Sequence, residues 1–257
     1  MNQGPPSLAI PRAARQIAAE WHWVAAHRDP LSPIAAQVVD TLPVPVKRWI
    51  SHSVPSEVPL STTASIGSHG RIRVGAWRPY TARQVIAAGV GFVWSARARI
   101  GPVAVTGFDR YTRAEGQMRW RLGGVIPVVA ASDADVTRSA AGRLASELVL
   151  TPAAALHPAV AWAPVDEHRA IAHIHIDGTA HGVEIDVDQD GLLRTVRVPR
   201  WGNPDRGAFA MHNFVVRCEG VRDGDGFRLP ARMEAGWNLD QGGEPFIEME
   251  IDSAVFH

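Results

Sequence analysis

Two acidic residues, Asp109 and Glu147, fall on faces of the chain that are otherwise apolar. Counting by twos from Val105 places Asp109 on the apolar side of a strand. Glu147 follows Leu144 by three residues, which places it within or beside the buried stripe of a helix. A carboxylate in an apolar cavity has a raised pKa and can act as a general acid or base. The alternative is structural ion pairing, because Arg143 precedes Glu147 by four residues.

A second pattern places His173 and His175 on one face of a predicted strand. Two imidazoles in this arrangement can bind one metal ion, and Glu184 and Asp186 on the next strand would complete the ligand set. The residues between them are apolar, which is typical of a hairpin with one solvated face and cross-strand pairs of histidine and acid. We favour the hairpin, so neither a metal nor another cofactor is expected.

Aromatic residues and arginines are the other candidates for a binding site. The chain has nine tryptophans and two tyrosines, and indoles on apolar strand faces either fill a core or line a pocket. We expect Trp94, Tyr111 and Trp120 to shape a pocket for an apolar ligand. Arg121 lies on the solvated face of its strand, unless that face turns inward at the cavity mouth and binds a ligand carboxylate. Arg143 is the second candidate cation for ligand binding.

Strands must position most of these residues. From Phe92 to Ile100, apolar residues alternate with Ser95, Arg97 and Arg99, which is the period of a strand buried on one face. Similar segments, separated by turn pairs such as Asp-Gly, predict strands at 61–74, 92–100, 103–111, 117–122, 125–130, 160–165, 170–176, 183–188, 192–198, 209–218, 227–237 and 246–256.

Helical spacing is found near the N-terminus, at 11–25, 32–42 and 46–50, and at two places between strands. Thr81 and Gln84 form a capping box that predicts a helix near 81–89, and a row of apolar residues predicts another near 137–151. The fold class is therefore mainly β (α+β): a curved antiparallel sheet that forms an open or closed β-barrel, with the helices packed on or inside it. We expect residues 1–52 to be a helical segment packed on the barrel and residues 53–257 to be one barrel domain.

Composition restricts the partners of the chain. The 26 basic and 26 acidic residues balance, so no net field favours nucleic acid. No segment approaches the roughly 18 apolar residues of a membrane span, and we expect no membrane insertion. The single cysteine, Cys218, excludes an internal disulfide, and residues 1–10 lack the pattern of a secretory signal, which predicts a cytoplasmic protein. Lys47 is the only lysine, a bias that we associate with GC-rich bacteria.

Four segments carry a resemblance: the stretch from Leu42 to Trp49, the strand that begins Gly91-Phe92-Val93-Trp94, the Asp109-Arg110-Tyr111 corner that leads to Gly116, and the Leu144-Ala145-Ser146-Glu147 helix that ends at Pro152. Together they resemble an uncharacterised bacterial family of unknown function. Its members are similar to lipoprotein carriers of the LolA and LppX type, whose curved sheet wraps helices around a hydrophobic cavity. The resemblance implies this half-barrel from Leu42 onward and no established reaction. The chain departs from the secreted carriers because it has no lipobox cysteine near its start.

Two functions fit these patterns. In the first, the barrel binds a hydrophobic or amphiphilic small molecule and catalyses a cofactor-independent step on it, such as cyclisation, isomerisation or hydrolysis. Glu147 and Asp109 would then be the catalytic acid and base. In the second, the chain binds or carries a lipid or hydrophobic metabolite without chemistry, and its acids are paired with arginines. A barrel filled by its own side chains would instead be a structural or interaction module. The sequence predicts neither the identity of the ligand nor the oligomeric state.

Overall fold

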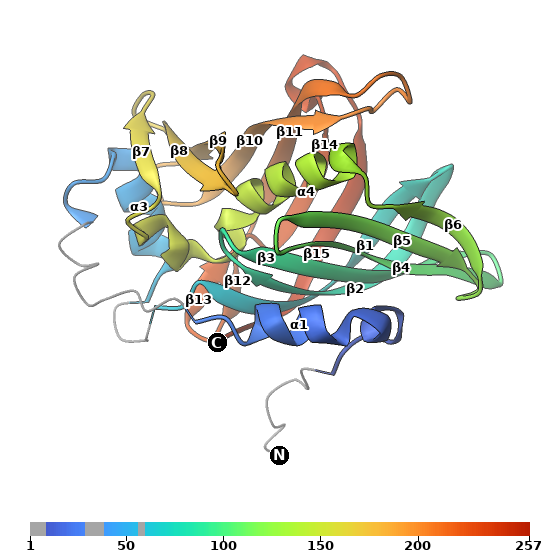
Figure 1. Ribbon diagram of the computed structural model, residues 1–257. Helices are drawn as coiled ribbons and strands as arrows, with labels where there is room; N and C mark the ends of the chain where they lie inside the picture. Colours follow the sequence, from blue (N-terminus) through green and yellow to red (C-terminus); the bar gives the residue numbers. More distant parts are fainter. Residues whose placement is uncertain (1–8, 29–38, 56–59) are drawn as a thin grey trace.

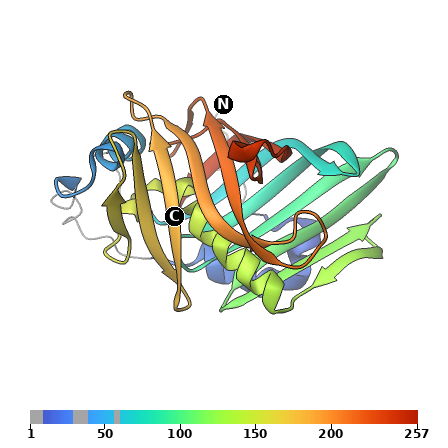
Figure 2. The same ribbon diagram turned by 90° about the horizontal axis from the view of Figure 1, so that it is seen from above.

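The computed structural model describes residues 9–28, 39–55 and 60–257. Thirteen strands form one antiparallel sheet in the order β6-β5-β4-β3-β2-β1-β15-β14-β11-β10-β9-β8-β7, and the sheet curls around an inner helix (Figures 1 and 2). A separate hairpin contains β12 and β13. The strands are β1 (Thr63–Val74), β2 (Ala76–Ala87), β3 (Gly91–Ile100), β4 (Val103–Thr112), β5 (Glu115–Leu122), β6 (Ile126–Ala131), β7 (Ala161–Pro164), β8 (Arg169–Ile176), β9 (Thr179–Val187), β10 (Leu193–Gly202), β11 (Ala210–Glu219), β12 (Arg222–Gly224), β13 (Phe227–Leu229), β14 (Arg232–Trp237) and β15 (Pro245–Phe256).

The sheet has two arms that join where β1 pairs with β15. We call β1–β6 the first arm. The second arm contains β15, β14, β11, β10, β9, β8 and β7. Within the described strands, β6 and β7 each pair with a single neighbour and lie at opposite edges. The sheet is therefore an open half-barrel. The predicted fold class, mainly β with a curved antiparallel sheet and helices, is confirmed.

Strand β3 shows how alternation produces the two faces of the sheet. Trp94, Ala96 and Ala98 are buried on the concave face, within the main apolar core. Arg97 and Arg99 are exposed on the convex face. The predicted two-residue period of this strand is confirmed, and a half-buried strand of this kind contributes one apolar wall to the inside of the curl.

The predicted helix over 81–89 is wrong, because this segment belongs to strand β2. The capping box of Thr81 and Gln84 is a local signal, whereas β2 pairs along most of its length with both β1 and β3. Tyr80, Gln84 and Ile86 are buried on one face of β2 with the two-residue period of a strand. Tertiary pairing on both sides therefore prevails over the local helical preference.

The predicted strand over 227–237 is also interrupted. Pro230 has no N–H group to donate to a ladder, and it separates β13, which pairs with β12, from β14, which belongs to the main sheet. The other predicted strands are observed, with ends that differ by a few residues.

Helices near the N-terminus pack against different parts of the sheet. The 3-10 helix η1 (Arg12–Ile17) and α1 (Ala18–Ala25) lie on the convex face of the first arm, where Trp21 packs in a core that contains Val85 and Val93 (Figure 1). Helix α3 (Val44–Ser53) contacts β8, β9 and β13. Most of the helix predicted over 32–42 lies outside the described residues.

Helix α4 (Ala134–Ser146) lies on the concave side, between the two arms (Figures 1 and 2). Its first turn is capped by the Asp133 carboxylate, which accepts a hydrogen bond of 2.9 Å from the Val136 N–H. The helix continues as 3-10 turns η2 (Glu147–Leu150) and η3 (Pro152–Leu156), so the helix predicted near 137–151 is confirmed. A further 3-10 turn, η4 (Leu239–Gln241), follows β14.

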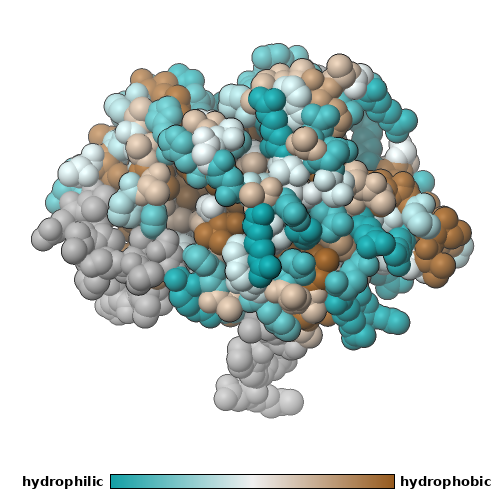
Figure 3. Space-filling model, in the orientation of Figure 1, coloured by the Kyte–Doolittle hydropathy of each residue, from teal (hydrophilic) through white to brown (hydrophobic). Residues whose placement is uncertain are grey.

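The free edge of the first arm has an apolar surface. Val125, Ile126 and Val128 are exposed, and Figure 3 shows apolar atoms gathered at the end of the sheet where β5 meets β6. Among the described residues, no helix has both the length and the apolar character of a membrane span.

Candidate functional site

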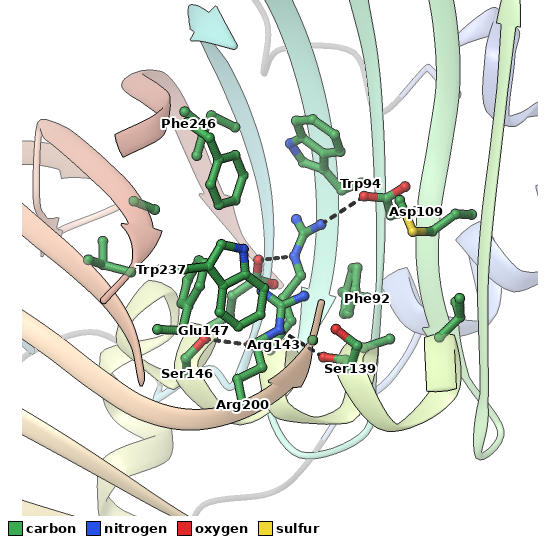
Figure 4. A pocket seen from close by; sticks show the side chains of 18 of the residues that line it. Phe92, Trp94, Asp109, Ser139, Arg143, Ser146, Glu147, Arg200, Trp237 and Phe246 are labelled. Carbon is green, nitrogen blue, oxygen red and sulfur yellow. Dashed lines mark hydrogen bonds and ion pairs between the residues drawn. The ribbon is translucent and has the colours of Figure 1, made fainter. Parts of the chain in front are cut away.

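A cavity of about 350 Å³ lies between α4 and the concave face of the sheet. Its apolar walls come from both arms, with Phe92 and Trp94 on β3 facing Trp237 on β14 and Phe246 on β15 (Figure 4). Gly202 shapes one end, because a Cβ atom at this position would lie 2.4 Å from the Trp237 ring. The cavity is therefore lined by aromatic side chains, and the missing side chain of Gly202 leaves the space that the Trp237 ring occupies.

One arginine on α4 connects the two acids that the sequence places on apolar faces. The Arg143 guanidinium lies 2.7 Å from the nearer Glu147 oxygen and 3.3 Å from the nearer Asp109 oxygen. It also lies over the rings of Phe92 and Trp94, 4.5 and 5.2 Å from their centres. Side-chain exposure is below a fifth for all three charged groups, at 17%, 15% and 19% for Arg143, Glu147 and Asp109. Water screens such pairs weakly, so the three groups form a single shielded ionic cluster.

Neutral donors complete the hydrogen bonding of each carboxylate. The Trp120 indole N–H donates to Asp109 at 2.8 Å, and the Gln84 amide donates to Glu147 at 2.6 Å. Burial raises the pKa of the Asp109 carboxyl above its ordinary value of 3.8, while Arg143 and the Trp120 hydrogen bond oppose this rise. Both acids are therefore held by defined partners.

A second arginine, Arg200 on β10, lines the same cavity. Its Nε donates a hydrogen bond of 3.0 Å to the Ser139 carbonyl on α4, and its stem passes Gly142, where a Cβ atom would lie 3.1 Å from the Arg200 Cγ. Its guanidinium lies 4.8 Å from the centre of the Phe214 ring and 5.3 Å from that of Trp237. Burial and the charge of Arg143 lower the pKa of Arg200 to about 9, so the group is protonated at neutral pH.

The predicted catalytic pair and two of the predicted ligand-binding residues line the cavity. Asp109, Glu147, Trp94 and Arg143 all contribute to its wall. Trp120 lies behind the wall, where its ring contacts Trp94 at 5.6 Å between centres and its N–H is bonded to Asp109. The structure therefore brings these five side chains together.

Two other predicted ligand-binding residues lie elsewhere. Tyr111 is buried, and its hydroxyl donates to the Asp177 carboxylate on the β8–β9 turn. Arg121 lies opposite Thr106, which in turn lies opposite Arg97, so Arg121 belongs to the convex face. There it lines a groove that is separate from the cavity.

His173 and His175, the candidate metal ligands, are exposed on β8. His173 lies opposite Gly182 and His175 opposite Ala180. The expected cross-strand pairs of histidine and acid are therefore wrong, because the register of the hairpin places small residues opposite both rings.

No group of three or more His, Cys, Asp or Glu side chains in the described ranges is arranged to hold a metal ion. Glu184, the first acid considered with those histidines, instead forms an ion pair of 2.7 Å with Arg197. Cys218 is buried in the core, where burial raises the pKa of its thiol to about 12. The thiol is therefore protonated at neutral pH and is a poor nucleophile.

Sequence signals also exist for two further cavity residues, Arg200 and Gln84. Arg200 continues the alternation of Val196 and Val198, both buried on β10, so its inward position follows from the same period that predicts the strand. Gln84 has the same signal on β2, where the capping-box interpretation conceals it. In both cases a polar residue lies on the apolar face of a strand.

The protein is therefore of the open half-barrel class, with an aromatic cavity and an ionic cluster on the concave side of its sheet. Residues 32–249 match the model of DUF6544, a family of unknown function. The chain belongs to this family. A comparison with curated proteins finds no match.

The solved structures to which this chain is similar include proteins from three bacteria. A LolA superfamily protein from Nitrosomonas europaea has 8% identity and a TM-score of 0.42, with 87% of this chain and 93% of that chain covered. An outer membrane lipoprotein-sorting protein domain from Vibrio parahaemolyticus has 8% identity, a TM-score of 0.40 and the same coverage. A DUF1329 family protein from Desulfovibrio piger has 10% identity and a TM-score of 0.37, with 89% and 93% covered.

Proposed function

We propose that this protein binds a hydrophobic or amphiphilic small molecule in the concave cavity and carries it without chemical change. The observation that carries the proposal is the cavity itself, whose volume of about 350 Å³ falls in the range of small-molecule sites, roughly 300–1,000 Å³. Its walls are mainly aromatic and aliphatic, which favours an apolar ligand.

The ionic cluster supports binding over catalysis. Glu147 is hydrogen-bonded to Arg143 and Gln84, and Asp109 to Arg143 and Trp120. Both oxygens of each carboxylate accept a hydrogen bond, which holds the two acids in fixed positions in the cavity wall. Carboxylates with two fixed partners each are better suited to shaping and rigidifying the cavity.

Titration with a neutral, polarity-sensitive dye such as N-phenyl-1-naphthylamine tests the proposal. We expect saturable binding to the full chain, and about tenfold weaker binding to Trp237→Ala, because the substitution removes one aromatic wall. The matched control is Trp77→Ala, which removes an indole from the β2 strand start outside the cavity. Non-saturable binding, or equal loss in both variants, would contradict the proposal.

An acid/base enzyme is the second candidate, and the raised pKa of Asp109 favours it. In that case Glu147 and Asp109 would transfer protons to and from the bound molecule, in a cyclisation, isomerisation or hydrolysis. Glu147→Gln keeps a side chain of the same size, so we expect ligand binding to survive within about threefold. If a reaction of a bound ligand is detected, its turnover must fall by about 100-fold or more in this variant; unchanged turnover rules out Glu147 as the proton-transfer residue.

A further inference from the structure

The charges in the cavity are not paired evenly. Arg143 has two carboxylates within ion-pair distance, Glu147 and Asp109. Arg200 faces the same cavity, but the ion pairs of the described residues include none to Arg200. Arg200 is half-buried, and a guanidinium that has lost part of its water without gaining an ion pair is costly. An anion brought in by a ligand would supply that charge.

The donors of Arg200 fit such a role. Its Nε is bonded to the Ser139 carbonyl, and its two terminal nitrogens have no acceptor among the residues that the structure describes. The guanidinium also lies against the Phe214 and Trp237 rings, which limit its movement. A fixed fork of N–H groups matches the two oxygens of a carboxylate, which it binds more strongly than a neutral acceptor.

We infer that the ligand of the cavity is an amphiphile with a singly charged carboxylate head group, and that Arg200 binds this head group. The inference rests on the proposed function and adds the chemical class of the ligand. Phe246, which Figure 4 shows at the cavity, extends the apolar wall together with Ile247 and Met249 on β15. These side chains provide the surface for the ligand's apolar chain.

The acids nearby select a head group of low charge. Asp109 and Glu147 line the same cavity as Arg200, and the attraction of both acids acts on its guanidinium. A second negative charge on the ligand would be repelled by these carboxylates. A carboxylate is therefore favoured over a doubly charged phosphate head group.

The test compares dodecanoate, methyl dodecanoate and dodecyl phosphate as competitors of the neutral dye, on the full chain. We expect the affinity for dodecanoate to be at least about tenfold higher than that for its methyl ester, because hydrogen bonds to a charged group are stronger than those to a neutral one. We expect dodecyl phosphate to bind more weakly than dodecanoate. This comparison needs no variant, so it remains decisive if a substitution prevents folding.

Variants then assign the head-group contact to Arg200. Arg200→Met keeps the apolar stem and removes the charge, and we expect dodecanoate affinity to fall about 10- to 100-fold while methyl ester affinity changes less than about threefold. Arg200→Lys keeps the charge but loses the fork, so an intermediate loss is expected. Arg121→Met is the matched control, because Arg121 lies on the convex face, and it should change neither affinity.

Two results would overturn the inference while leaving the proposed function intact. One is equal binding of the acid and the ester, and the other is a parallel loss of both in Arg200→Met, which would mean that Arg200 only shapes the cavity. Tighter binding of dodecyl phosphate would overturn the choice of carboxylate. If no competitor and no dye binds the native chain, the proposed function fails, and the inference fails with it.

Discussion

At the scale of single residues, Arg143 decides how the two buried acids behave. Its guanidinium lies between Glu147 and Asp109 and over two aromatic rings. Removing the arginine would leave both carboxylates without their cation, and breaking a buried pair in this way typically costs about 3–5 kcal/mol. Arg143 is therefore the residue that makes a polar cluster tolerable inside an apolar half-barrel.

Asp109 gives this cluster a measurable dependence on pH. Its raised pKa means that the native state binds the proton more tightly than the unfolded chain. Proton binding by Asp109 thus stabilises the native state fully at pH values below the ordinary pKa of 3.8. This stabilisation is lost as pH rises through the raised pKa, and the free energy of unfolding falls by at most about 1.4 kcal/mol per pH unit. Asp109→Asn removes this titration. The free energy of unfolding of the variant should therefore fall less than that of the native protein as pH rises from 3.8 through the raised pKa. Urea unfolding from acid to neutral pH measures this difference, and parallel curves for the two proteins would contradict it.

The faces of Asp109 and Glu147 could be predicted from the sequence, because each belongs to a local period of two residues or of 3.6 residues. The four-residue spacing of Arg143 and Glu147 also indicates their ion pair. The contact of Arg143 with Asp109 could not be predicted, since it depends on where α4 crosses β4. Arg200 had a signal in the alternation of β10, although a buried arginine is rare enough that alternation alone is weak support.

At the scale of elements, the position of α4 determines the cavity. Gly116 on β5 allows the helix to approach, because a Cβ atom there would lie 2.6 Å from the Thr137 Cα. Gly116→Ala should therefore move α4 outward, lower the free energy of unfolding by about 1–3 kcal/mol and weaken dye binding. Gly207→Ala is the control, because nothing lies within 4 Å of that position. Equal stability of the two variants would show that this approach does not position the helix.

Strand β2 explains why the element prediction failed in one place. Thr81 and Gln84 provide a real helix-start signal, and the segment also alternates with a period of two residues. A helical period and a two-residue period both fit a segment this short. Whether it forms a helix or a strand therefore depends on the segments that pair with it. Those partners, β1 and β3, are separate segments whose pairing with β2 is tertiary.

At the scale of the whole molecule, the half-barrel places apolar side chains from distant parts of the chain around one space. Phe92 on β3 and Phe246 on β15 line it from the two arms, and α4 lies between them. The sequence predicts the curled sheet because alternation is strong in most strands. It leaves the size of the interior open, because that size depends on how the arms and α4 pack together.

In the function that we propose, this interior binds an apolar chain of limited length. Calorimetric titration of the full protein with straight-chain primary alcohols of increasing length tests it most directly, because these ligands carry no charge. Affinity should rise about fourfold with each added methylene, which corresponds to about 0.8 kcal/mol, and should then level off when the chain fills the cavity. The absence of saturable binding at every chain length would contradict the claim.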